Sequence, residues 1–301
     1  MPDTFYYGGQ AVIEGVMIRG KKSMAIAVRR PDKGITVASQ PLSPLYTGRW
    51  RRLPFLRGII VLIETMVLGI RALMFSANVV AGEGEEIPRG VMWGTVIFAL
   101  VFVVALFFLT PLFASRLFEP YLSPLLANIA EGVLRLAIFL AYLLLISLTR
   151  DIRRVFAYHG AEHKAINAYE AGIPLEVAAI QKYSTVHTRC GTGFLLIVLV
   201  VAVFLFSLLG RPSLWLMVTS RVVLIPALAA ISYELMRLSA RYAHRPGVRA
   251  MLAPGLALQS LTTRQPSPDQ LEVALAALKR SLEEDGAAES PQATSSAESS
   301  L

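Results

Sequence analysis

The sequence is poor in charged residues and in cysteine. Of its 301 residues, 17% are charged and 54% are hydrophobic, whereas a soluble domain has about 25% charged residues. The mean hydropathy is +0.55, which argues against an ordinary cytosolic enzyme. Cys190 is the one cysteine, so no disulfide can form within the chain and nothing indicates an oxidising compartment.

Two further patterns are missing. Met1–Gly20 has no apolar run between a basic start and a cleavage site, so no signal peptide is expected. The glycine-rich block Gly8–Gly20 lacks the Gly-Lys-Ser/Thr ending of a phosphate-binding loop, and its spacing alone indicates a strand with tight glycine bends. The net charge of +8 comes from clusters between long uncharged stretches, a pattern that favours a membrane protein and argues against a nucleic-acid partner.

What the sequence does contain is a set of long apolar segments. About 20 apolar residues in a helix cross the roughly 30 Å hydrocarbon core of a bilayer. Four segments qualify, namely Val91–Ser115, Val133–Thr149, Gly193–Leu209 and Leu214–Leu235. Arg221 lies near the start of the fourth, where its side chain is expected to reach the interface. The sequence therefore predicts a mainly α-helical membrane protein with about four transmembrane helices.

The basic residues outside these spans predict the orientation in the membrane. Residues 1–90 hold twelve Lys and Arg, residues 150–192 hold six, and residues 236–301 hold seven, whereas residues 116–132 and 210–213 hold one each. The positive-inside rule places the basic side in the cytoplasm. Both termini and the loop 150–192 are therefore expected to be cytoplasmic.

Leu56–Asn78 does not fit the pattern of a simple span. Arg57, Glu64, Arg71 and Asn78 recur every seven residues, so they form one narrow polar stripe along an apolar helix. If this helix crossed the membrane, the nine basic residues before it would lie outside, against the rule. An interfacial helix, or one packed against the bundle with its stripe paired, is favoured over a fifth span.

The polar parts form small sections on either side of the spans. Ser23–Arg30 alternates apolar and polar residues before the turn Pro31–Gly34, which predicts a β-hairpin. A leucine stripe follows a helix start at Ser267, which predicts packing against the N-terminal section. The expected organisation is a cytoplasmic β section over 1–55, an amphipathic helix over 56–78, a metal-site loop over 150–192, a C-terminal helical section over 236–285 and a disordered tail over 286–301.

The histidines and the cysteine gather in the loop between the second and third spans. His159, His163, His187 and Cys190 fall within 32 residues. His159 and His163 are one helical turn apart, so both imidazoles can bind one ion. The His187-x-x-Cys190 spacing is typical of structural zinc sites. These residues predict a divalent metal site, and zinc is the metal that such donors favour.

The order His159-x-x-Glu162-His163 is that of inverted zinc proteases, in which the glutamate accepts a proton from a metal-bound water. This makes Glu162 a candidate general base. Four protein ligands would make the site structural, whereas three with an open position would make it catalytic. Glu170 or Glu234 can replace Cys190 as a ligand. Lys164 and Arg189 are candidates for stabilising negative charge beside the metal, although basic residues at span ends also satisfy the positive-inside rule.

Five ordered blocks carry a resemblance to a known family. They are Gly8–Gly20, Leu56–Asn78, Tyr158–Lys164, His187–Gly193 and Pro254–Leu278. The sequence resembles the YqhQ-like family, bacterial multipass membrane proteins of undefined function described as predicted metal-dependent enzymes. The resemblance implies a plasma-membrane location and a metal site at the three histidines and the cysteine. It also makes Glu14 and Arg19 candidates for a site that faces the metal loop.

The favoured hypothesis is a cytoplasm-facing, metal-dependent membrane enzyme, a hydrolase of a peptide or lipid-linked substrate. The alternative is a non-catalytic assembly or scaffold protein, in which a closed metal site fixes the loop and the soluble parts engage a membrane protein partner. A transporter ranks third, because residues 91–115 and 193–209 contain no ionisable group of the kind that permeation paths need.

Overall fold

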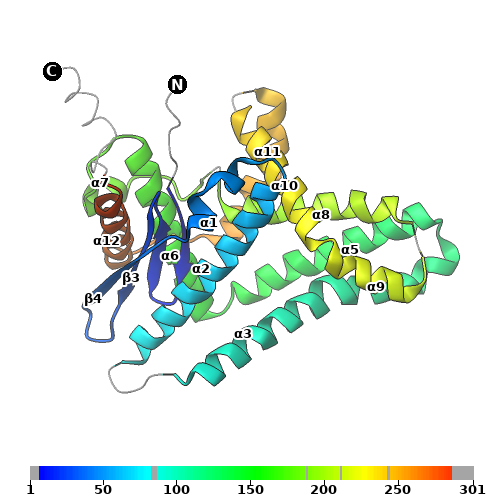
Figure 1. Cartoon of the computed structure of the whole chain (residues 1–301), viewed down its shortest axis with the longest axis horizontal. Coiled ribbons are helices and arrows are strands. Elements are labelled where there is room, and N and C mark those ends of the chain that lie inside the picture. Colours follow the sequence, from blue (N-terminus) through cyan, green and yellow to red (C-terminus); the bar gives the residue numbers. More distant parts are fainter. Residues whose placement is uncertain (1–6, 83–86, 188, 211, 243–244, 287–301) are drawn as a thin grey trace.

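The computed structural model describes residues 7–82, 87–187, 189–210, 212–242 and 245–286. The described chain is mainly α-helical with one four-stranded sheet, as the sequence predicts (Figure 1). The strands are antiparallel in the order β1 (Gly8–Val12), β2 (Gly15–Arg19), β3 (Ser23–Arg29) and β4 (Ile35–Pro41). The hairpin around Pro31–Gly34 is confirmed as β3 and β4. Most of the tail predicted to be disordered, residues 287–301, lies outside the described residues.

The helices divide into short connectors and long segments. They are α1 (Pro44–Thr47), the 3₁₀ helix η1 (Arg49–Arg52), α2 (Leu56–Ala81), α3 (Arg89–Val104), the π-helical turn η2 (Ala105–Leu109), α4 (Thr110–Ser115), the 3₁₀ helix η3 (Arg116–Tyr121), α5 (Pro124–Ile146), α6 (Arg150–Glu170), α7 (Val177–Ile180), α8 (Gly191–Leu208), α9 (Leu214–Val223), α10 (Ile225–Arg241), α11 (Pro246–Thr262) and α12 (Pro268–Asp285).

The sheet is covered on both faces, which explains why β2 and β3 are apolar almost throughout. Val16 and Ile18 pack with α6 and α12 in one core. Met17 and Ile26 point to the opposite face and pack against α2 in a second core. The predicted leucine stripe of α12 is buried in the first core. Alternate strand residues thus hold two helical layers on one sheet.

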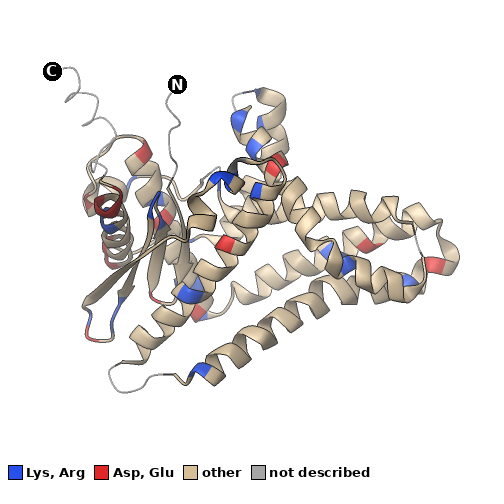
Figure 2. Ribbon diagram, viewed as in Figure 1, with Lys and Arg blue, Asp and Glu red and all other residues tan. Residues whose placement is uncertain are grey.

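The remaining long helices extend away from this sheet and carry few charges (Figures 1 and 2). Four helical segments are long and apolar enough to cross a membrane, namely α2, residues 89–121, α5 and α8. If α9 and α10 together count as one span, the number of candidate spans is five, although this pair bends by 49°. The bend falls at Leu224, two residues before Pro226, whose nitrogen cannot donate a helical hydrogen bond. The protein is therefore a membrane protein by the length and composition of its helices.

Helix α2 packs differently from the other candidate spans. Its neighbours include β3, η1 and α10, and in Figure 1 it runs at an angle to α5 and α8. Its polar stripe is paired at several points. Arg57 Nε donates to Glu234 over 2.6 Å, and Glu64 accepts from Arg19 over 2.9 Å. Asn78 Oδ1 accepts from the backbone of Ile87. The polar stripe therefore attaches α2 to the sheet section and to α10.

A charged network is buried inside the helical bundle. Pro111 has no N–H to offer to the carbonyl of Phe107, and Arg135 Nε donates to this oxygen over 2.9 Å. Arg135 also donates to Glu131 over 2.6 Å, and Arg221 donates to the same carboxylate over 2.8 Å. The Arg135, Arg221 and Glu131 side chains are at most 2% exposed.

The expectation that Arg221 reaches the interface is wrong. The side chain turns inward because Glu131, on another helix, offers both carboxylate oxygens. The Arg221 guanidinium carbon also lies 4.0 Å from the centroid of the Phe206 ring, where a cation is attracted to the ring face. Arg221 therefore joins α9 to α5 and α8 within the bundle.

We expect Glu131→Gln to destabilise the protein, because two buried guanidinium groups lose their carboxylate. Breaking a buried ion pair from one side costs about 3–5 kcal/mol, so the purified protein in detergent should unfold at a clearly lower temperature. The control is Glu119→Gln, whose carboxylate pairs with Arg116 at a partly exposed site where a pair contributes about 0–1 kcal/mol. Equal unfolding temperatures for the two variants would contradict this role for the network.

Candidate metal site

Helix α6 presents two histidines on one buried face. The His159 and His163 rings lie one turn apart, with their centroids separated by 4.4 Å. The helix can approach its neighbours closely because two glycines lie at the contacts. A Cβ on Gly9 of β1 would lie 2.9 Å from Glu162 Cγ, and one on Gly160 would lie 2.1 Å from the carbonyl oxygen of Arg264. Both glycines therefore allow the histidine face of α6 to pack closely against β1 and the segment after α11.

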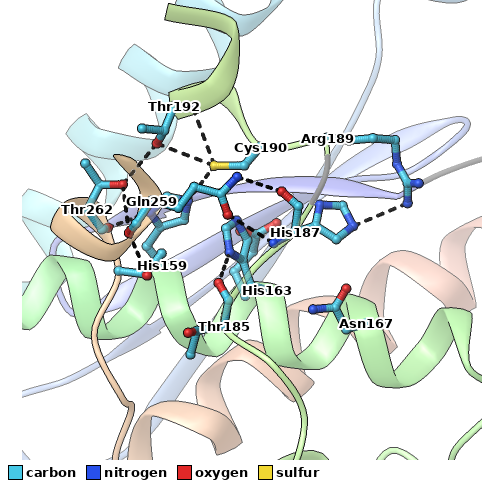
Figure 3. A network of polar contacts seen from close by, with 12 residues as sticks. His159, His163, Asn167, Thr185, His187, Arg189, Cys190, Thr192, Gln259 and Thr262 are labelled. Atoms are coloured by element: carbon cyan, nitrogen blue, oxygen red, sulfur yellow. Dashed lines mark hydrogen bonds and ion pairs between the residues drawn. The ribbon is translucent and has the colours of Figure 1, made fainter. Parts of the chain in front are cut away.

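Cys190 reaches this face from the start of α8 (Figure 3). It is the N-cap residue of α8, and its Sγ accepts a hydrogen bond from the Thr192 backbone over 3.4 Å. Sγ also lies 3.3 Å from His159 Nε2. One ligand atom each from His159, His163 and Cys190 lies within 4.8 Å of the other two. The structure thus brings together three of the four predicted ligands.

Backbone carbonyls set the orientation of both α6 histidines. His159 Nδ1 lies 2.8 Å from the carbonyl oxygen of Thr262, and His163 Nδ1 lies 2.5 Å from that of Thr185. A carbonyl only accepts, so Nδ1 carries the proton in each ring. Nε2 is then the nitrogen with a lone pair, as in histidines that bind metals through Nε2.

His187 lies at the edge of this group. Its ring centroid is 5.5 Å from that of His163, and its Nε2 is 3.3 Å from Arg189 Nη2 and 3.8 Å from a Glu170 oxygen. Its backbone is fixed by Gln259, whose amide accepts from the His187 N–H over 3.0 Å and donates to the carbonyl over 2.8 Å. His187 is thus near the three ligands but is directed toward other partners.

Glu170 and Arg189 form an ion pair beside His187. Burial raises the pKa of Glu170, but the contacts with His187 and Arg189 outweigh this effect and hold the pKa below its ordinary value. Lys164 donates to the carbonyls of Gln181 and Tyr183 over 2.6 and 2.7 Å. Lys164 therefore fixes the loop after α6.

Two of the candidate acids lie in structural contacts. Glu234 pairs with Arg57 and joins α10 to α2. Glu14 is in the turn between β1 and β2 at a φ of 53°, where it accepts from Arg154 Nη2 over 2.6 Å and from the Tyr158 hydroxyl over 3.2 Å. Neither belongs to the group of three close ligand atoms. Both hold elements together.

The histidine face opens into a cavity of about 810 Å3 between the sheet and helices α2, α6, α8 and α10. Glu162 lines it and is 4% exposed, with its Oε2 3.6 Å from His163 Nε2. Arg19 lines it as well. Of the two residues that the resemblance made candidates, Arg19 lines the cavity, whereas Glu14 does not and instead pairs with Arg154.

The same cavity is lined by Arg51 and Glu64, which sequence reasoning missed as site residues. Arg19 and Arg51 both pair with Glu64, and both donate to the carbonyl oxygen of Tyr46. Burial lowers the pKa of Arg19, and the nearby charge of Glu64 opposes this effect. Glu64, in the polar stripe of α2, was the signal in the sequence that could have indicated these site residues. Its partners could not be identified from it, because they come from distant parts of the chain.

Comparison with known proteins gives the family. Residues 53–284 match the family described as "Protein of unknown function (DUF1385)". The chain is 38% identical over 286 residues to a protein of Bacillus subtilis (strain 168) named "Uncharacterized protein YqhQ", an alignment that covers 89% of this chain and 90% of that protein. No solved structure matches the chain. With most of its length matched, the chain belongs to the YqhQ-like family of uncharacterised proteins.

Proposed function

We propose that this protein is a metal-dependent membrane enzyme whose site holds zinc at His159, His163 and Cys190. The support is the chemistry of the donors, since imidazole nitrogen and thiolate sulfur are the ligands that zinc favours. The carbonyls bonded to the two Nδ1 atoms also fit, because such partners orient metal-binding histidines. Three protein donors beside a cavity correspond to a catalytic rather than a closed site.

The residues around this site fit a hydrolytic reaction. A zinc ion held there would supply a water molecule that is acidic near neutral pH. Glu162 lies on the same cavity wall as the donors, so its carboxylate is placed to accept a proton at Oε1 or Oε2. The cavity provides space for a substrate. A scaffold protein would not need such a space. The single observation that carries the proposal is this juxtaposition of donors, carboxylate and cavity.

The scaffold protein remains the second candidate, and the position of His187 favours it. Its ring lies next to that of His163, so a rotation of the side chain would bring a fourth donor to the group. A site with four protein ligands is closed to water. The metal would then fix the loop before α8, and the soluble parts would be available to a membrane protein partner.

For location, we propose the bacterial plasma membrane with both termini and the cavity in the cytoplasm. The support is the excess of Lys and Arg in residues 1–90, 150–192 and 236–301. Helix α2 would lie along the interface, because its stripe is paired with the sheet section and α10.

We expect the purified protein to bind one zinc ion and His159→Ala or Cys190→Ala to lose it, measured as metal content by mass spectrometry. X-ray absorption should show three protein ligands and one water, and His187→Ala should retain zinc. The control is Lys182→Ala, at an exposed position in the same loop. Four protein ligands and no water would favour the scaffold. A wild-type protein without stoichiometric metal would remove the support for both candidates.

We expect Glu162→Gln to keep its zinc and to lose hydrolytic activity by about 100-fold or more, the usual contribution of a positioned general base. The assay is hydrolysis of p-nitrophenyl acetate by the zinc-loaded protein. The control is Glu176→Gln, an exposed carboxylate further along the loop. Full activity in Glu162→Gln would refute the assignment of the base. Zinc-loaded wild-type protein that is no more active than metal-free protein would favour the scaffold.

Topology can be tested because the chain has one cysteine. In a Cys190→Ser background, a membrane-impermeant maleimide should label Ser213→Cys in intact cells and Lys182→Cys only after permeabilisation. Both positions are exposed, and Ser213 makes no side-chain cap hydrogen bond to α9. The reverse labelling pattern would place the cavity outside the cytoplasm.

A further inference from the structure

The walls of the cavity are unequal in charge. Five basic side chains line it, against two acidic ones, Glu64 and Glu162. The basic residues are Arg19, Lys21, Arg51, Arg189 and Arg237. They come from β2, from the turn between β2 and β3, from η1, from the residue before Cys190 and from α10. Because they come from several elements, they surround the volume instead of forming one exposed face. A cavity with this excess of positive charge attracts an anion.

The arginines from β2 and η1 are fixed in place before any ligand arrives. Both pair with the single carboxylate of Glu64, which is 4% exposed, and both donate to the carbonyl oxygen of Tyr46. In the described part of the chain, the hydrogen bonds of Arg51 are made by Nη1. Its Nε and Nη2 can therefore donate together to a ligand, in the planar geometry that suits phosphate oxygens.

The cavity lining also includes apolar side chains. Val61 and Leu62 of α2, Phe194 of α8 and Met236 of α10 line it together with the charged groups. Helices α2 and α8 are among those apolar enough to cross a membrane. The cavity thus combines cationic and apolar side chains near the start of α8. A ligand that matches both kinds of lining has an anionic group and a hydrocarbon chain.

We infer that this cavity binds the phosphate group of an amphiphile, with Arg51 and Arg237 as direct contacts and the hydrocarbon chain along α2 and α8. Phosphate fits better than carboxylate because it offers three acceptor oxygens and up to two negative charges to cations on several walls. The inference rests on the proposed function and deepens it by naming the substrate class. Binding of the amphiphile does not depend on the zinc, because the arginines do not belong to the zinc site. Only the reaction of the bound amphiphile depends on the zinc.

The test is a binding measurement with defined lipids on the full-length protein in detergent. The probe is dioleoyl phosphatidic acid, compared with dioleoylglycerol, which lacks the phosphate, oleate, which carries a carboxylate, and glycerol 3-phosphate, which lacks the chains. Microscale thermophoresis gives each dissociation constant. We expect phosphatidic acid to bind at least about tenfold more tightly than each of the other three, as one or two charge-assisted hydrogen bonds would give.

Variants locate the binding. Arg51→Gln and Arg237→Gln should each weaken phosphatidic acid binding about tenfold, with no change for dioleoylglycerol. The matched controls are Arg49→Gln, two residues from Arg51 in η1, and Arg241→Gln, one turn from Arg237 in α10. Neither control residue lines the cavity. Arg237 is exposed, so its variant should also keep the wild-type unfolding temperature.

The outcomes separate this inference from the zinc proposal. Phosphatidic acid binding that persists in Cys190→Ala, with its zinc lost, would support the phosphate site on its own. Normal zinc content with equal affinity for phosphatidic acid, oleate and dioleoylglycerol would overturn it while the zinc proposal stands. Equal binding of glycerol 3-phosphate would overturn the assignment to an amphiphile. Equal losses in the control variants would show attraction to the general surface charge and would also overturn the inference.

Discussion

The pair of hydrogen bonds between the Gln259 amide and the His187 backbone connects the parts of the chain that build the site. It joins α11 to the loop before α8 across 72 residues of sequence. One turn later on α11, the Thr262 carbonyl orients His159 and the Thr262 hydroxyl contacts Thr192 of α8. Helix α6, the start of the candidate span α8 and the end of α11 thus meet at a few buried polar contacts. These contacts fix the loop that carries His187 and Cys190 beside the α6 histidines.

The local parts of this arrangement were predictable from the sequence. The spacing of His159 and His163 places them on one face in any α-helix, and the leucine stripe of α12 requires an apolar partner wherever it packs. The hairpin of β3 and β4 is indicated by its alternation and its turn residues. These features depend on neighbours within about ten residues, so periodicity contains the necessary information.

The parts that were not predictable depend on partners far apart in the chain. Arg221 finds Glu131 at a separation of 90 residues, and no local pattern indicates that it turns inward. Glu64 is visible as part of a polar stripe, but Arg19 and Arg51 lie on other elements. For His187, the His-x-x-Cys spacing predicted a shared ion, whereas Gln259, Arg189 and Glu170 determine where its backbone and ring lie.

The bend between α9 and α10 gives two halves of one apolar run different surroundings. Helix α9 keeps Arg221 in the bundle, whereas α10 turns by 49° and brings Tyr233 and Arg237 to the cavity. A straight helix would direct these two side chains elsewhere, and the cavity would lose one of its walls. The bend at the start of α10, where Pro226 has no N–H to continue the helical hydrogen bonds, therefore contributes to which chemical groups a ligand meets beside the sheet.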